Sequence, residues 1–172
     1  MKPWWVLNRK APSGVYPLED IVQGLEKSKS LQRLFASKQE TARTVRSCQG
    51  EVRRFDGYMW VNDENGRIIV SRAYLREGNE VHVYLDFLHE IVHVVQWRNG
   101  RELFDENYKY VDRPTEIEAY RVVVKEARSL GLSTEEIVEY LRVPWVTEEE
   151  FQRMLAHLGF RRTKAPRAKK GR

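Results

Sequence analysis

Apolar residues in the first quarter of the chain recur at steps of three and four positions. They fall within residues 17–39, at Ile21, Val22, Leu25, Leu31, Leu34 and Phe35. This spacing places them on one face of a helix, so the segment is predicted to be helical. Gly24 and the Ser-Lys-Ser stretch interrupt the pattern and can divide the segment into two short helices.

Residues 44–85 show a different pattern, of short runs rich in β-branched and aromatic residues. The runs are TVRSCQGEVRRF, GYMWV, GRIIVSRAYL and EVHVYL. Turn-forming stretches such as NDENG and REGNE separate them, which predicts a small antiparallel sheet. NDENG, at residues 62–66, predicts a hairpin between YMWV and RIIV. His82, in the last run, is expected on a strand.

The rest of the chain is predicted to be helical. A first helix covers about residues 86–98 and ends near Gly100, which can take a left-handed cap conformation. After a loop, Pro114 suits the first turn of a second helix. STEE (133–136) and TEEE (147–150) each match a capping box and open two further short helices. The order of elements predicts an α+β fold.

The length of 172 residues suits one domain with its own core. We predict a single domain over residues 1–160, followed by a tail over 161–172. The tail holds seven Lys or Arg residues and no acid, in a chain of net charge +5. This composition is typical of a disordered, solvated segment. The alternative is a basic arm that makes weak contacts with nucleic-acid phosphates.

Cysteine content and the first residues bear on the cellular compartment. Cys48 is the single cysteine, which excludes an intrachain disulfide and suits a reducing compartment. The start, MKPWWVLNRK, lacks the apolar run of a secretory signal, and no stretch is apolar enough to span a membrane. These features predict a cytoplasmic protein without a membrane partner.

The strongest chemical signal is HEIVH, within the apolar run FLHEIVHVVQ. Side chains four residues apart on a helix lie one above the other, so His89 and His93 can direct ring nitrogens at one metal ion. Glu90 then lies beside the metal, where it can take a proton from an activated water. The alternative is a buried helix that carries two hydrogen-bonded histidines. The zinc interpretation also requires a third protein ligand.

No histidine follows the motif until His157, so the third ligand is sought among acids. The candidates are Glu102, Asp105, Glu106, Asp112, Glu116 and Glu118. Steps of three and four from Glu116 give an apolar stripe, whereas the same steps from Glu118 give a mostly polar face. A carboxylate on the buried face needs a partner, and a metal ion would be one. Glu116 is the predicted ligand, with Glu118 and the loop acids as alternatives.

The motif and the downstream glutamate together resemble the gluzincins, zinc metallopeptidases with HExxH on one helix and a glutamate ligand on the next. HEIVH followed by TEIEAY is similar to their ExxA pattern, over about residues 86–130. The resemblance implies a zincin-like fold, zinc held by His89, His93 and Glu116, and catalysis by Glu90.

Two further expectations follow from this resemblance. In gluzincins an edge strand of the sheet binds the substrate backbone, and GRIIVS, at residues 66–71, is similar in position. Many gluzincins also have an aspartate four residues after the ligand glutamate, which orients a motif histidine. This chain has Tyr120 there, so a different acceptor is required.

Several residues outside the motif are candidates for secondary roles. A donor to a developing oxyanion could be Tyr108, Tyr110, Tyr120 or His157, each of which also suits packing or the surface. Cys48 lies about forty residues before the motif, which is similar to the cysteine ligand of peptide deformylases. Its flanking residues, RSCQGE, do not match their segment, so Cys48 is expected to be a small buried hydrophobe.

These observations predict a zinc-dependent metallopeptidase that acts on peptide or protein substrates. Glu90 is the predicted catalytic base, and zinc is the predicted cofactor. The competing hypothesis is a non-enzymatic module, in which zinc only fastens two helices and the basic tail contacts nucleic acid.

Overall fold

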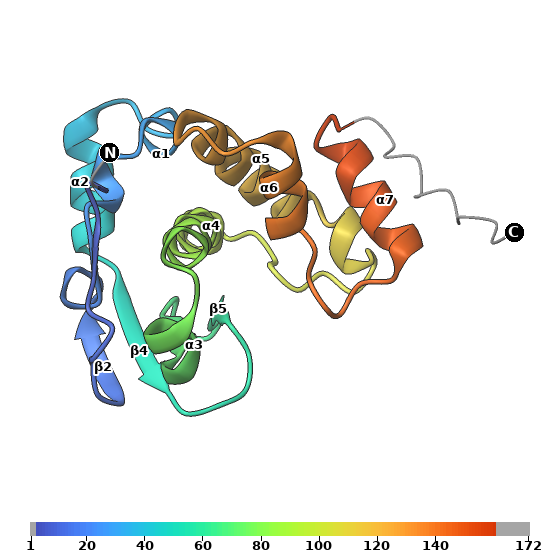
Figure 1. Cartoon of the computed structure of the whole chain (residues 1–172). Coiled ribbons are helices and arrows are strands. Elements are labelled where there is room, and N and C mark those ends of the chain that lie inside the picture. The colour runs from blue at the N-terminus through green and yellow to red at the C-terminus, as the bar shows by residue number, and fades with distance from the viewer. Residues whose placement is uncertain (1–2, 161–172) are drawn as a thin grey trace, which may run out of the picture.

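The computed structural model describes residues 3–160, and the predicted tail at 161–172 lies outside them. The chain mixes helices and short strands, as the sequence predicted (Figure 1). The helices are α1 (Lys29–Gln32), α2 (Lys38–Arg46), α3 (Arg72–Glu77), α4 (Glu80–Arg98), α5 (Pro114–Ser129), α6 (Thr134–Tyr140) and α7 (Glu148–His157). The strands are β1 (Val6–Leu7), β2 (Gly14–Pro17), β3 (Val22–Gln23), β4 (Gln49–Arg53), β5 (Met59–Val61) and β6 (Ile68–Ser71). Three 3-10 turns complete the described elements: η1 (Leu18–Asp20), η2 (Leu25–Lys27) and η3 (Tyr110–Asp112).

Four of the strands form a sheet in the order β2-β4-β6-β5. β4 and β6 run parallel, whereas β2 with β4 and β5 with β6 are antiparallel. The sheet is therefore mixed, and the prediction of a wholly antiparallel sheet was wrong. Alternating apolar residues reveal a strand but carry no information on its direction, which explains the error. β6 lies inside the sheet with all four residues buried, and the outer strands are β2 and β5.

The hairpin predicted at NDENG is confirmed between β5 and β6. The amide of Asn62 donates to the carbonyl of Arg67 over 2.8 Å, and Gly66 has φ +70°. The indole of Trp97, near the end of α4, packs on Gly66 so closely that a side chain there would overlap the ring. Trp97 also donates from Nε1 to the carbonyl of Asp63 over 2.6 Å. The turn of the hairpin is thus fixed against the motif helix.

The runs RAYL and EVHVYL form helices, and their prediction as strands was wrong. The side chains of Ser71 and Asn79 cap α3 and α4, so the motif helix already starts at Glu80. His82 accordingly lies on a helix. Consecutive residues of α4 are buried here, because protein surrounds the helix. The sequence of a helix that is buried on all sides does not show amphipathic periodicity. Its β-branched residues then give the same sequence pattern as a buried strand.

The segment at residues 17–39 is less helical than predicted. It contains η1, β3, η2 and α1, while the longer helix α2 runs from Lys38 to Arg46. Gly24 has φ +91° and packs against the main chain of Trp4, which leaves no space for a side chain. The chain turns there and β3 pairs with β1. The apolar residues therefore reach the core from a folded-back segment instead of from one helix face.

The helix boundaries predicted after the motif are confirmed. Gly100 follows the end of α4 with φ +75°, in the left-handed region that closes a helix. Pro114 is the first residue of α5. The capping boxes at residues 133–136 and 147–150 both form, and they open α6 and α7. These signals are local, so they could be read from the sequence.

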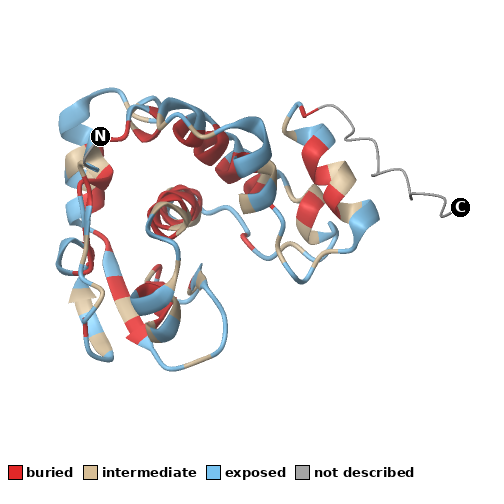
Figure 2. Cartoon of the chain, viewed as in Figure 1, coloured by how far each residue is buried: buried red, intermediate tan, exposed pale blue. Residues whose placement is uncertain are grey.

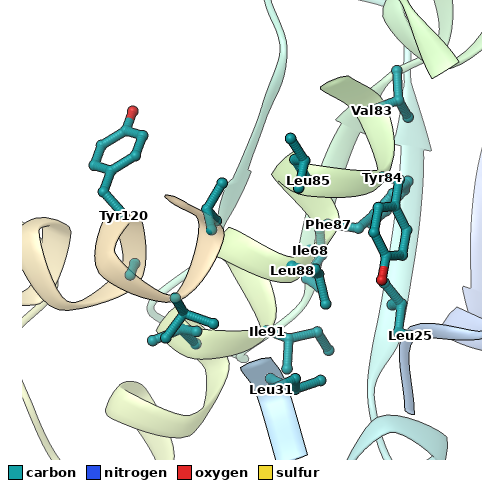
Figure 3. Close-up of a cluster of buried hydrophobic side chains, with 14 of the residues drawn as sticks. Leu25, Leu31, Ile68, Val83, Tyr84, Leu85, Phe87, Leu88, Ile91 and Tyr120 are labelled. Atoms are coloured by element: carbon teal, nitrogen blue, oxygen red, sulfur yellow. The ribbon is translucent and has the colours of Figure 1, made fainter. Parts of the chain in front are cut away.

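Helix α4 lies at the centre of the molecule, with the sheet and α3 on one side and α5 and α6 on the other (Figure 1). It is buried around most of its circumference (Figure 2). Leu88 and Ile91 of α4 belong to one buried cluster with Leu25 and Leu31 of the N-terminal segment (Figure 3). No helix within residues 3–160 is both long and apolar enough to cross a membrane. Packing on several sides fixes the position of the motif helix.

Candidate metal centre

The motif residues of α4 and the first turn of α5 come together in the interior. His89 Nε2 lies 3.1 Å from Glu116 Oε2, and His93 Nε2 lies 3.4 Å from the same oxygen. The two Nε2 atoms are 2.9 Å apart. His89, His93 and Glu116 could together hold a metal ion. Within residues 3–160, no other three His, Cys, Asp or Glu side chains lie close enough to do so.

Local structure explains why Glu116, and not Glu118, meets the histidines. Because α5 begins at Pro114, Glu116 lies in its first turn, on the face that packs against α4. Glu118 points outward with a side chain that is 48% exposed, and it pairs with Arg101. The periodicity of the α5 sequence indicated this difference between the two acids.

The charges of His89, His93 and Glu116 would allow a metal ion to take the place of a proton held between them. Burial opposes the charge of Glu116, but hydrogen bonds to His89 and His93 outweigh it and hold the Glu116 pKa well below its ordinary value. Burial would lower the pKa of His93, yet the hydrogen bond and charge of Glu116 raise it to about 9. Burial and the nearby His93 lower the pKa of His89. Without metal, the site thus keeps one proton on His93 opposite the Glu116 carboxylate.

Zinc binding should therefore release a proton, and zinc affinity should rise with pH up to about 9. Below that pH, His93 of the metal-free protein is protonated, and the ring must lose this proton before Nε2 can bind metal. The affinity should change by up to about tenfold per pH unit in this range. Calorimetric titration in buffers of different ionisation enthalpy measures the proton release, and we expect a value of at least one near neutral pH. A pH-independent affinity would contradict this arrangement.

Glu90 follows His89 on α4 and is buried beside the group. Burial is the main cause that raises the pKa of Glu90 to about 8, while a main-chain hydrogen bond from Val61 in β5 acts in the opposite direction. Glu90 Oε2 has no hydrogen-bond partner among the described residues. A buried carboxyl group with a free oxygen and a pKa near neutrality can both accept and return a proton.

Gln96 is a residue of the site that the sequence analysis did not identify. Its Oε1 lies 2.7 Å from His93 Nδ1, and its Nε2 donates to the carbonyl of Thr115 over 3.0 Å and to Glu118 over 2.6 Å. These contacts orient the imidazole so that Nε2 faces Glu116. Gln96 is 3% exposed. A buried amide three residues after His93, in an otherwise apolar run, was the available signal.

His89 has no comparable acceptor. Its Nδ1 makes no hydrogen bond with the part of the chain that the structure describes. The ring of Tyr120 packs against the imidazole, with 4.3 Å between centroids, and the Tyr120 hydroxyl lies 2.6 Å from that of Tyr110. Tyr120 therefore contacts His89 through its ring. The acceptor that orients a motif histidine is Gln96, and the histidine that it orients is His93.

The other candidate residues lie outside this group. None of the remaining acids joins a ligand cluster within residues 3–160: Glu102, Asp105, Glu106, Asp112 and Glu118. His157 binds Asp112 near the surface over 2.9 Å, and Tyr108 is 44% exposed, so neither is placed as an oxyanion donor. Cys48 is buried, as expected of a small hydrophobe, and its thiol donates to the carbonyl of Thr44.

The sheet edge beside the site is β5, and the expectation that GRIIVS supplies it was wrong. β6 is interior because β5 covers its outer side. Asn62 donates to Arg67, and Tyr58 accepts from Ser71, so both main chains face β6. Alternation along an antiparallel strand then turns the N–H and C=O of Met59 towards the free edge. These two groups lie on the edge of β5 that no other strand of the described residues covers.

Two hollows meet at Glu90. One, of about 250 Å³, is lined by residues that include Tyr58, Tyr74, Asp86, His89, Tyr120 and Tyr140. The other, of about 200 Å³, is lined by residues that include Trp60, Val61, His93, Phe104, Arg113 and Glu116. Met59, Tyr110 and Trp145 border both hollows. The carboxyl group of Glu90 is therefore reached from two sides of the same cleft.

The donor set of two imidazoles and one carboxylate fits a divalent metal ion with one position left open, as in hydrolytic zinc sites. Other first-row metals accept similar ligands, so the donor set does not identify the element. The unpartnered oxygen of Glu90 agrees with an open position next to the metal. Comparisons with family models, curated proteins and solved structures find no match to this chain.

Proposed function

We propose that this protein is a zinc-dependent metallopeptidase of the gluzincin type. The observation that carries the proposal is the convergence of His89, His93 and Glu116 beside the unpartnered oxygen of Glu90. The order of a sheet, an HExxH helix and a glutamate-bearing helix supports a zincin-like arrangement. A structural zinc site has four protein ligands and no open position. Three candidate ligands next to a cleft favour catalysis over a metal that only fastens two helices.

In this proposal the residues divide the work of amide hydrolysis. Zinc held by the two histidines and Glu116 would supply a Lewis acid and acidify a water molecule. Glu90 accepts the proton of the attacking water on Oε2 and returns it to the leaving amine. Burial raises the pKa of Glu90, which makes its ionised form a stronger base. Gln96 keeps the imidazole of His93 in its ligating orientation.

Tyr110 is the proposed donor to the oxyanion of the transition state. It borders both hollows together with Glu90. Burial raises the pKa of Tyr110 well above its ordinary value, so the phenol keeps its proton. Its hydroxyl lies 2.6 Å from that of Tyr120, which positions it. A neutral, oriented hydroxyl in a buried cleft is the kind of group that stabilises developing negative charge.

An extended peptide is the substrate class that the cleft supports best. The free edge of β5 offers the main-chain groups of Met59 to a backbone that binds as an additional strand. Aromatic side chains that are partly exposed border the cleft: Tyr58, Trp60, Phe104 and Trp145. They can cover apolar parts of a peptide on both sides of the scissile bond.

Hydrolysis of unstructured peptides tests the proposal directly. Chelated protein, reconstituted with one equivalent of zinc, is incubated with a mixed peptide library, and mass spectrometry identifies the products. We expect cleavage that requires zinc and disappears on chelation, with a His89→Ala/His93→Ala protein as the metal-free control. If protein with stoichiometric zinc cleaves no peptide, the metal is structural and the proposal is wrong.

A further inference from the structure

The larger hollow contains a carboxylate that the proposed mechanism does not use. Asp86 lies four residues before Glu90, which is about 6 Å along the helix axis and on the same side of α4. The hydroxyl of Tyr74, from α3, lies 2.6 Å from Asp86 Oδ2, and that of Tyr140, from α6, lies 2.5 Å from Oδ1. The carboxylate thus lies where three helices meet the wall of the hollow.

No basic side chain within residues 3–160 forms an ion pair with Asp86. Arg142 lines the same hollow, but its guanidinium is paired with Glu148 over 2.8 Å. His82 also lines it, and burial lowers the pKa of His82, so the ring is neutral near pH 7. Glu139 adds a second acid at the rim. The hollow therefore carries negative charge that no basic side chain within residues 3–160 balances.

The surroundings of Asp86 suit a cation more than they suit an apolar group. The rings of Tyr58, Tyr110 and Trp145 border the hollow, and aromatic faces attract ammonium and guanidinium groups. Each oxygen of Asp86 accepts from one tyrosine and keeps a second acceptor position free. A largely buried carboxylate with only neutral partners is costly, and a cationic ligand would remove that cost. The aromatic rings and the charge both point to a ligand with a positive end.

We propose that this hollow binds a cationic group of the substrate next to the scissile bond, either a lysine or arginine side chain or a free α-amino group. The inference rests on the proposed function, because Glu90 lines the hollow. Its volume of about 250 Å³ is below the roughly 300–1,000 Å³ of sites for drug-sized ligands, so it suits one side chain or one chain end.

Matched peptides test the charge preference without any change to the protein. One series carries lysine on either side of the scissile bond, and the other carries norleucine, which has the same carbon chain and no charge. We expect kcat/KM to be at least tenfold higher for lysine. Each peptide is made with a free and with an acetylated N-terminus. A preference for lysine in the acetylated peptides assigns the hollow to a side chain. Equal cleavage of the free lysine and norleucine peptides, with slower cleavage of both after acetylation, assigns it to the α-amino group.

The variant Asp86→Asn tests which residue recognises the charge. Its amide keeps the shape of the side chain and can bond to both tyrosine hydroxyls, so folding should survive, which thermal melting checks. We expect the ratio of lysine to norleucine cleavage to fall to within about twofold. Tyr74→Phe is the matched control, because it removes one hydrogen bond to Asp86 and keeps the charge. It should retain the preference for lysine.

Failure of this inference is distinguishable from failure of the proposed function. Equal cleavage of all four peptides, with no preference for lysine and no effect of acetylation, or a preference that persists in Asp86→Asn, overturns the cation site and leaves the peptidase intact. If zinc-loaded protein cleaves no peptide, the peptidase proposal fails. Calorimetric binding of the same acetylated and free peptides to the unaltered protein then tests the hollow, and equal affinities of all four peptides overturn it.

Discussion

Replacement of Glu90 by glutamine is expected to abolish peptide hydrolysis while zinc stays bound. The amide has the size of the carboxylate and can still accept the main-chain hydrogen bond of Val61, but it cannot take a proton from water. Loss of general-base catalysis should lower kcat by about 10²- to 10⁴-fold. The measurement combines steady-state kinetics with the metal content of the same sample.

A control for this variant is available on the same helix. Glu80, in the first turn of α4, is exposed and remote from the metal group, so Glu80→Gln removes the same charge without touching the site. It should keep both activity and zinc. Undiminished hydrolysis by Glu90→Gln would show that another group takes the proton. Loss of zinc together with activity would show that Glu90 holds the metal in place.

Replacement of Glu116 by glutamine should weaken zinc binding by at least about a hundredfold, the upper end of the cost of losing a partner outside the ligand shell. Glu116 is the one anionic member of the group, and its negative charge is compensated by a proton on His93 when metal is absent. An amide oxygen lacks this charge and is a weaker ligand for zinc. Competition with a chelator of known affinity measures the change.

Glu118→Gln is the matched control for Glu116→Gln, because it makes the same substitution two residues away on the exposed face of α5. Gln96 can still donate to the amide oxygen at position 118 in this variant, and it keeps the carbonyl of Thr115. Its zinc affinity should therefore stay within about tenfold of the original protein. If Glu116→Gln binds zinc as tightly as Glu118→Gln, Glu116 is not a ligand.

Features that depend on neighbouring residues could be predicted from the sequence. The step of four between His89 and His93, and the periodicity that separates Glu116 from Glu118, are properties of single helices. The capping boxes and the NDENG hairpin are equally local. Together they gave the three side chains that the structure brings together.

Features that depend on distant partners could not be predicted. The parallel pairing of β4 with β6, and the position of β5 at the edge, follow from contacts across the chain. The early start of α4 was hidden because surrounding protein removes the polar face that would have marked a helix. The link from Gln96 to Thr115 joins two helices, so helix periodicity gives no indication of it.

The contact between Trp97 and Gly66 has a consequence for the cleft. It holds the hairpin against the C-terminal part of α4, beyond Glu90. The distance between β5 and the motif therefore depends on Gly66 having no side chain where the Trp97 ring packs. A side chain at Gly66 would push β5 away from α4 and change how a peptide lies against the helix. The groups that contact the metal ligands would stay the same.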